Sequence, residues 1–471
     1  MGKIIAYVAM PHPPIIIPEV GHGEEKKIKN TYDACESIGR EIAEIKPEVI
    51  IIVTPHGVMF SDAIALSFEN NISGSLKQFG APKVSMKFEI DMDLTQKIME
   101  KSDENNIPTV KVTTSNLKRY DREYELDHGS IVPLYFIKDK YNSFKLVHIT
   151  YGGLTPIQLY KFGKLIKETV EESNKNVVFI GSGDLSHRLK DEGPYDYNPY
   201  GEKFDKEIIN LLTSGDVAGV FNINYEMIEN AGECGLRSYY IMIGSMEGNE
   251  IKGELLSYEG TFGVGYAVMK FKLKSSDRDM LSEITIEKRK MHMKRINNED
   301  CYVRLARESL THYLAEGNLM DLPSYVTEEM INNKRGVFVS LKKFGALRGC
   351  IGTIFPITDS IAKEIMRNAV EAGESDPRFS NVSLGELEDI VFSVDVLTEP
   401  IEALKEELNP KKYGVVVRSG RKSGLLLPDL EGVNTIEQQI SIVLNKASIS
   451  PTENYSIEKF EVIRHKGYEN G

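Results

Sequence analysis

Short runs of β-branched and other apolar residues alternate with amphipathic stretches over the first half of the chain. Short apolar runs are typical of buried strands, whereas an apolar stripe on one helical face is typical of surface helices. The predicted strands are Lys3–Ala9, Val49–Val53, Lys145–Thr150 and Val177–Ile180. The predicted helices are Tyr32–Glu44, Pro156–Ser173 and Gly201–Ser214. This alternation indicates an α/β domain with a mixed central sheet flanked by helices.

The second half has a different pattern, and a change of composition precedes it. Residues 273–295 are rich in Ser, Asp, Glu, Lys and Arg, which predicts a partly helical linker between domains at residues 1–272 and 296–471. Helices are predicted from Ile296 onward and at Asp359–Ala372, and strands at Arg335–Leu341, Ile390–Leu397 and Gly414–Arg418. We expect an α+β fold for this domain.

Reactive side chains directly follow the predicted strands of the first domain. His12 and His56 each come after a proline at the end of an apolar run, and Asp184–His187 follows the strand at Val177–Ile180. In open α/β sheets, the loops at the carboxyl ends of the strands converge on one crevice where ligands bind. We therefore expect these three segments to lie close together.

A carboxylate completes a candidate metal site. Glu233 lies in the run Ala231-Gly232-Glu233-Cys234-Gly235. Two imidazoles and one carboxylate are the ligand set of a non-haem Fe(II) site with positions open for substrate and dioxygen. Zinc or manganese would accept the same ligands, with metal-bound water as a hydrolytic nucleophile. Taken alone, Glu233 is equally compatible with a residue at a helix N-terminus, where the helix dipole favours it.

Composition narrows the class of protein. The chain has 471 residues, 41% of them hydrophobic and 27% charged, which is typical of a soluble globular protein with two domains. Its net charge of −13 argues against nucleic-acid and membrane partners and favours a small-molecule substrate. The four cysteines form no CxxC pair, the apolar start is broken by four prolines and His12, and no stretch approaches a membrane span. These features predict a cytoplasmic protein.

Five motifs of the first domain occur in the order seen in class III extradiol ring-cleavage dioxygenases. They are Met10-Pro11-His12-Pro13-Pro14, Thr54-Pro55-His56-Gly57, Leu126-Asp127-His128-Gly129, Gly181-Ser182-Gly183-Asp184-Leu185-Ser186-His187 and Gly232-Glu233-Cys234-Gly235. Residues 2–272 thus resemble the LigB-like catalytic subunit of these dioxygenases and the Memo proteins built on the same fold. Dioxygenation of a catechol-like substrate is the reaction that this resemblance implies.

The resemblance also implies roles for individual residues. His12, His56 and Glu233 would hold Fe(II), His187 would act as an acid/base, and His128 would be a second active-site histidine. Asp184 or Asp127 could orient a neighbouring imidazole. A simpler interpretation of His128 is that it caps the helix predicted near Ser130. His22 and His148 follow no such motif, and we expect both to be structural.

The second domain carries a motif of its own, Gly345-Ala346-Leu347-Arg348-Gly349-Cys350-Ile351-Gly352-Thr353. With Asp376-Pro377-Arg378-Phe379 and Gly424-Leu425-Leu426-Leu427-Pro428, it makes residues 296–468 similar to the AMMECR family. Arg348 could bind a carboxylate or phosphate, and Cys350 could be a nucleophile. The alternatives are an Arg348 ion pair with a carboxylate such as Glu371 or Asp376, and a Cys350 that is simply buried in a strand.

The order of the two domains resembles the AmmeMemoRadiSam family of fused proteins. That resemblance implies a radical SAM protein as partner, and it suggests a homodimer. A different class of function also fits the same motifs, namely a metal-binding scaffold that uses a dioxygenase fold as a recognition surface.

Overall fold

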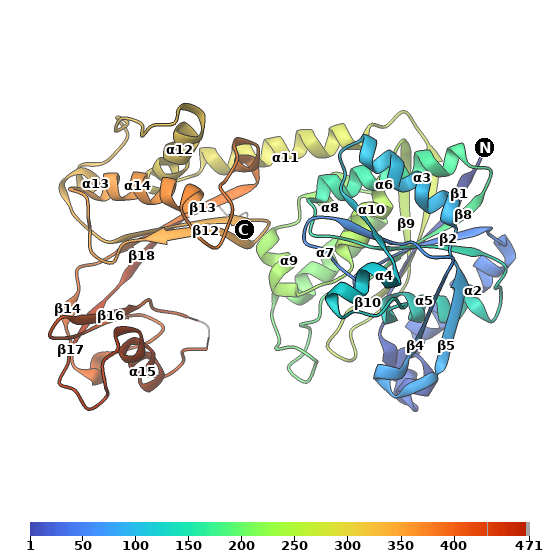
Figure 1. Ribbon diagram of the computed structural model, residues 1–471, viewed down its shortest axis with the longest axis horizontal. Coiled ribbons are helices and arrows are strands. Elements are labelled where there is room, and N and C mark those ends of the chain that lie inside the picture. Colours follow the sequence, from blue (N-terminus) through green and yellow to red (C-terminus); the bar gives the residue numbers. More distant parts are fainter. Residues whose placement is uncertain (431, 468–471) are drawn as a thin grey trace. The chain divides into compact units, whose positions relative to one another are not determined.

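The computed structural model describes residues 1–430 and 432–467 and divides into two compact units, Met1–Lys288 and Arg289–Gly471 (Figure 1). The predicted linker region holds the end of one strand, Tyr266–Ser275 (β10), and most of a helix, Met280–Asn297 (α11). Within the described residues, no helix is long and apolar enough to cross a membrane.

The first unit is built on an eight-stranded sheet with the order β6-β3-β7-β2-β8-β1-β10-β9. Its strands are Lys3–Met10 (β1), Val49–Thr54 (β2), Ile64–Ser67 (β3), Thr109–Val112 (β6), Lys145–Thr150 (β7), Asn176–Ser182 (β8), Asn249–Glu259 (β9) and β10. Strands β1, β8, β2 and β7 are parallel neighbours, whereas β10 pairs antiparallel with β1 and with β9. The predicted mixed sheet is therefore confirmed. A separate hairpin is formed by Asn71–Leu76 (β4) and Ala81–Glu89 (β5).

Helices cover both faces of this sheet (Figure 1). One face packs against Met92–Glu104 (α3), Pro156–Glu172 (α6), Tyr200–Ser214 (α7) and Leu236–Gly244 (α10), and the other against Lys29–Ile45 (α2) and His128–Lys138 (α5). Every residue of β2 is buried, as expected for a strand covered on both faces. Shorter helical segments are Pro14–Ile16 (η1), Pro18–Gly21 (α1), Glu24–Ile28 (η2), Lys77–Phe79 (η3), Thr114–Leu117 (α4), Lys118–Tyr120 (η4), Val217–Phe221 (α8) and Tyr225–Ala231 (α9).

The second unit contains two antiparallel four-stranded sheets, which confirms the predicted α+β class. Their strands are Val337–Lys343 (β11), Ala346–Gly352 (β12), Ile390–Leu397 (β13), Ile401–Glu402 (β14), Gly414–Ser419 (β15), Lys422–Leu426 (β16), Ser456–Phe460 (β17) and Val462–Lys466 (β18). Its helical segments are Cys301–Glu316 (α12), Glu328–Asn332 (α13), Ile361–Glu374 (α14), Leu384–Asp389 (η5), Lys405–Glu407 (η6) and Ile436–Ala447 (α15).

The first helix of this unit begins later than its apolar pattern suggests. The prediction placed its start at Ile296, but that residue belongs to α11, and α12 begins at Cys301. Asp300 ends the intervening segment because its carboxylate accepts from the backbone N–H groups of Tyr302 and Val303, both at 3.0 Å. An N-cap aspartate of this kind fixes where a helix can start.

Candidate metal centre

His12 is held in one orientation at the end of β1. Its backbone N–H donates to Asp184 Oδ1 at 2.8 Å, and its Nδ1 lies 3.0 Å from Ser182 Oγ. The Ser182 hydroxyl donates to the carbonyl oxygen of Gly129, so the serine oxygen accepts the Nδ1 proton of His12. His12 Nε2 therefore carries a free lone pair, which is the form that a metal ion binds.

Three histidines converge at this point. His12 Nε2 lies 3.0 Å from His56 Nε2, and the ring of His128 stacks on that of His56 with the centroids 4.2 Å apart. One ring nitrogen from each of the three histidines lies within 4.8 Å of the other two. His12 is 1% exposed, so this group extends from the interior of the domain. The loops after β1 and β2 and the start of α5 thus form a candidate metal site.

The charges around the three imidazoles suit a cation. Burial lowers the pKa of His12 well below its usual range, and burial with the neighbouring His56 and His12 lowers that of His128 to about 3. Burial also lowers the pKa of His56. All three rings are thus neutral near pH 7 and offer lone pairs, while Asp127 and Asp184 supply nearby negative charge. A divalent ion fits this donor set.

Glu233 lies just before α10 and is not a member of the three-histidine group. Its Oε2 accepts from the backbone N–H of Leu236 at 2.6 Å, the arrangement expected of a carboxylate at a helix N-terminus. Burial raises the pKa of Glu233 to about 7. Glu233 therefore lies at the start of α10, and one of its two carboxylate oxygens is already hydrogen-bonded to the backbone.

Cys234 lies beside His12, although the sequence did not predict it as a site residue. Its Sγ lies 3.6 Å from His12 Nε2 and accepts from the backbone N–H of Asp184 at 3.3 Å. The only sequence signal was its position beside Glu233 in the glycine-flanked motif. A thiol at this distance can contact an ion bound by His12.

His187 lies at the edge of the site. Its backbone N–H donates to the carbonyl oxygen of Ala231 at 3.0 Å, and its ring stacks on Tyr195 with the centroids 5.4 Å apart. Burial lowers its pKa, opposed by the charge of Asp184. A neutral imidazole in this position can accept a proton near pH 7.

Asp127 and Asp184 hold the histidine loops in place. Asp127 caps α5 by accepting from Ser130 N at 3.2 Å, so the cap is Asp127 rather than His128, which is the first helical residue. Burial alone would raise the pKa of Asp127, but the hydrogen bonds from His148 and Thr54 and the nearby imidazoles together outweigh burial and hold it below the usual range. Burial raises the pKa of Asp184 to about 6.

Two glycines let the motif after β8 and the motif before α10 touch backbone to backbone. A Cβ added to Gly183 would lie 2.0 Å from the Cα of Gly235, and one added to Gly235 would lie 2.9 Å from Tyr239 Oη. No other residue type fits at Gly183 without moving one of the two segments. This contact brings Asp184 next to Cys234.

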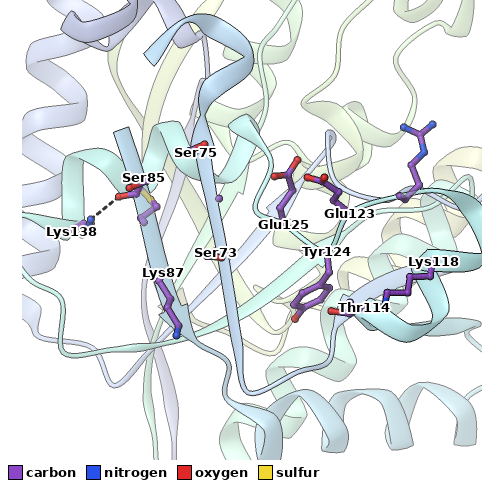
Figure 2. Close-up of a pocket in the computed structure, with 13 residues that line it drawn as sticks. Ser73, Ser75, Ser85, Lys87, Thr114, Lys118, Glu123, Tyr124, Glu125 and Lys138 are labelled. Atoms are coloured by element: carbon purple, nitrogen blue, oxygen red, sulfur yellow. Dashed lines mark hydrogen bonds between the residues drawn. The ribbon is translucent and has the colours of Figure 1, made fainter. Parts of the chain in front are cut away.

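A cavity lies beside the segment that leads to His128. It has a volume of about 930 Å³ and is lined by the hairpin β4–β5, by α4 and η4, and by residues 122–125 (Figure 2). Lys138 donates to the carbonyl oxygen of Ser85 across one side of it, at 3.0 Å. None of the three clustered histidines lines this cavity.

In the second unit, Arg348 pairs with a carboxylate that the sequence reasoning did not single out. Its Nε donates to Glu386 Oε2 at 3.0 Å and its Nη2 to Oε1 at 3.1 Å, so the partner is neither Glu371 nor Asp376. Asp376 instead pairs with Arg378 and accepts from Cys350 N at 2.8 Å. Cys350 itself is half-buried in β12, where its Sγ accepts from Ser340 Oγ at 3.1 Å.

The Arg348–Glu386 pair makes a prediction for stability in acid. Burial alone would raise the pKa of Glu386, but hydrogen bonds from Arg348 and Lys343 lower it from 4.5 to about 2. The pair therefore contributes fully above about pH 4.5 and is lost as the pH falls toward 2. Glu386→Gln should flatten the dependence of unfolding free energy on pH across this window, measured by urea denaturation. The exposed Glu406→Gln is the control, and an unchanged acid slope in Glu386→Gln would contradict the assignment.

Two family models match separate parts of the chain. The model of the catalytic LigB subunit of aromatic ring-opening dioxygenase matches residues 6–269, and the AMMECR1 model matches residues 303–467. Protein CA_C1420 of Clostridium acetobutylicum is 58% identical over 461 residues, which cover 98% of each chain. A Thermotoga maritima protein is 44% identical over 172 residues, 36% of this chain and 98% of its own.

Solved structures resemble parts of the chain. A Pyrococcus horikoshii protein, PH0010, is 33% identical, with a TM-score of 0.31 and coverage of 35% of this chain and 88% of its own. An Escherichia coli protein, JW3007, is 12% identical, with a TM-score of 0.39 and coverage of 56% of this chain and 98% of its own. Because a match to the LigB model spans more than half of the chain and one relative matches nearly all of it, the chain belongs to the metal-dependent LigB family of ring-opening dioxygenase subunits, fused here to an AMMECR1 domain.

Proposed function

We propose that the first domain is a non-haem Fe(II) oxygenase of the extradiol type, acting on a small catechol-like molecule. The convergence of His12, His56 and His128 carries this proposal, because three neutral imidazoles within reach of one ion form a cation site. When bound, Fe(II) would bring a substrate and dioxygen together and allow electron density to pass between them.

The residues of the chain divide the remaining work. His12 and His56 are the two ligands on which the sequence resemblance and the three-histidine geometry agree. His187 takes the proton from a substrate hydroxyl, since its lowered pKa keeps the imidazole neutral near pH 7, with a lone pair available to accept a proton. His12 lies at the buried end of the site and His56 at its exposed end.

The third ligand is the point where geometry and resemblance differ. His128 is in the cluster, whereas Glu233 is the carboxylate that the resemblance implies. From the geometry we expect His128→Ala to lower iron stoichiometry more than Glu233→Ala does, measured by elemental analysis of anaerobically loaded protein. Greater loss in Glu233→Ala would instead make Glu233 the third ligand and leave His128 to stabilise developing charge on the substrate.

Electron paramagnetic resonance tests the proposed function directly. Fe(II)-loaded protein exposed to nitric oxide, a dioxygen surrogate, should give a high-spin iron–nitrosyl signal because the site leaves positions open. His187→Ala should keep that signal, since His187 lies outside the cluster. A folded, iron-loaded protein without the signal would overturn the oxygenase proposal in favour of a scaffold.

For the whole chain, we also propose action beside a radical SAM protein, as the similarity of this domain fusion to the AmmeMemoRadiSam family suggests. The two domains match separate family models in one polypeptide, which supports a joint role. Co-purification of the full-length chain with a radical SAM protein from its own cells would support this partnership, and reconstituted mixtures that do not associate would contradict it.

A further inference from the structure

A buried chain of polar side chains lies behind the metal cluster. His148, on β7, places its Nδ1 2.8 Å from Ser67 Oγ and its Nε2 3.1 Å from Asp127 Oδ2. Ser67 and His148 are each 4% exposed. His148 follows no sequence motif and was expected to be only structural, yet it contacts the carboxylate that directly precedes His128.

The hydrogen bonds fix the tautomer of His148. Ser130 Oγ donates to Asp127 Oδ2 at 3.1 Å, and ionised Asp127 can only accept, so His148 Nε2 is the donor toward this pair. His148 Nδ1 is then the acceptor of the Ser67 hydroxyl. Every polar atom of the imidazole is satisfied, which makes this a defined support rather than a loose contact.

The hydrogen-bond network extends from Asp127 to the loop that holds His56 and to the start of α5, where His128 lies. Asp127 Oδ1 accepts from Thr54 Oγ1 at 2.5 Å, and the same hydroxyl oxygen accepts from the backbone N–H of His56 at 3.2 Å. Asp127 also caps α5, whose first residue is His128. One carboxylate thus fixes the positions of His56 and His128 together.

The order serine, histidine and aspartate is that of a hydrolytic triad, but the surroundings exclude this role. Ser67 is buried, and the cavity beside it has a volume of about 10 Å³, roughly the space for one water molecule. A substrate carbonyl cannot reach the hydroxyl in such a space. The hydrogen bonds from Ser67 through His148 therefore orient Asp127 and do not act on a substrate.

We infer that His148 is a positioning residue of the metal centre, which acts through Asp127 to hold His56 and His128 at binding distance from one ion. This inference rests on the proposed metal site. Outer hydrogen-bond partners of metal ligands typically change metal affinity about 10- to 100-fold when removed. Here the partner acts on two loops at once, because Thr54 and the α5 cap share the same carboxylate.

Two substitutions at one position isolate the hydrogen bond. His148→Phe keeps an aromatic ring but removes the donor, so it should weaken Fe(II) binding about 10- to 100-fold. His148→Gln keeps an N–H donor at a similar reach, so it should restore most of the affinity. The iron–nitrosyl spectrum should broaden in His148→Phe and sharpen again in His148→Gln, which is a readout of ligand geometry that a loss of stability alone would not change.

The control is Thr169→Ala, which removes a buried hydroxyl that donates to Leu165 O on α6 at 2.7 Å and is not part of this chain of contacts. It should lower stability but leave Fe(II) affinity unchanged. The inference would be overturned if His148→Phe kept the Fe(II) affinity and spectrum of the unmodified protein. It would also be overturned if His148→Phe and Thr169→Ala both lost Fe(II) affinity in proportion to their loss of stability. If the unmodified protein binds no ion, the metal-site proposal fails, and the inference fails with it.

Discussion

His56→Ala should abolish stoichiometric binding of Fe(II). The Nε2 atoms of His56 and His12 face each other 3.0 Å apart, and His56 is the member of the cluster that also stacks on His128. Its removal leaves one strongly oriented imidazole and separates the remaining donors. We expect affinity to fall by more than the roughly 100-fold that marks the upper range for outer partners. Isothermal titration of the metal-free protein under anaerobic conditions measures this change.

The matched control for His56→Ala is His22→Ala. His22 lies at the end of α1 in a left-handed conformation and is not in the cluster. It should bind iron as the unmodified protein does. Retention of one tightly bound ion in His56→Ala, with an intact fold by circular dichroism, would show that the ion is held elsewhere.

Gly183→Ala should destabilise the first domain by about 3 kcal/mol or more. The added methyl would lie 2.0 Å from the Cα of Gly235, which is backbone and cannot rotate away. The loop after β8 and the start of α10 must therefore separate, and Asp184 moves away from Cys234. Metal affinity should fall with stability, because Asp184 also anchors the backbone of His12. Chemical denaturation and metal titration test the two effects.

Gly385→Ala separates the packing effect from the substitution itself. A Cβ at Gly385 meets no atom within 4 Å. That variant should unfold at the same denaturant concentration as the unmodified protein, within error. Equal stability of Gly183→Ala and Gly385→Ala would mean that the contact between the two motifs is looser than the structure has it.

The sequence predicted the strands that bear the site because their signals were local. The run Val49–Val53 is apolar, and all of β2 is buried, so composition alone predicts a strand, and the prediction ended within one residue of the end of β2. Smaller elements such as β3 and β6 carry four residues each and were not predicted. Their pairing with one another, and of β3 with β7, depends on neighbours distant in the chain, which a local pattern does not contain.

The site was predicted in part for a similar reason. Position after a strand was enough to bring His12 and His56 together. The position of a residue after a strand does not say where its side chain points. The sequence therefore could not show that Cys234 lies beside His12, whereas Glu233 accepts a hydrogen bond from Leu236 N. His148 lacked any motif because its role arises from a register position: it is central in β7, opposite Ile52.

The residues of the metal cluster come from distant parts of the chain, so metal binding depends on folding. The hydrogen bond from His12 to Ser182 joins residues 170 positions apart, and His12 and His56 are 44 apart. An unfolded chain cannot hold these groups around one ion, so the ion binds only the native state. Free metal at about 100 times its dissociation constant would then add roughly 2.7 kcal/mol to stability. Supply of the ion in the cell would set the lifetime of the folded domain as well as its chemistry.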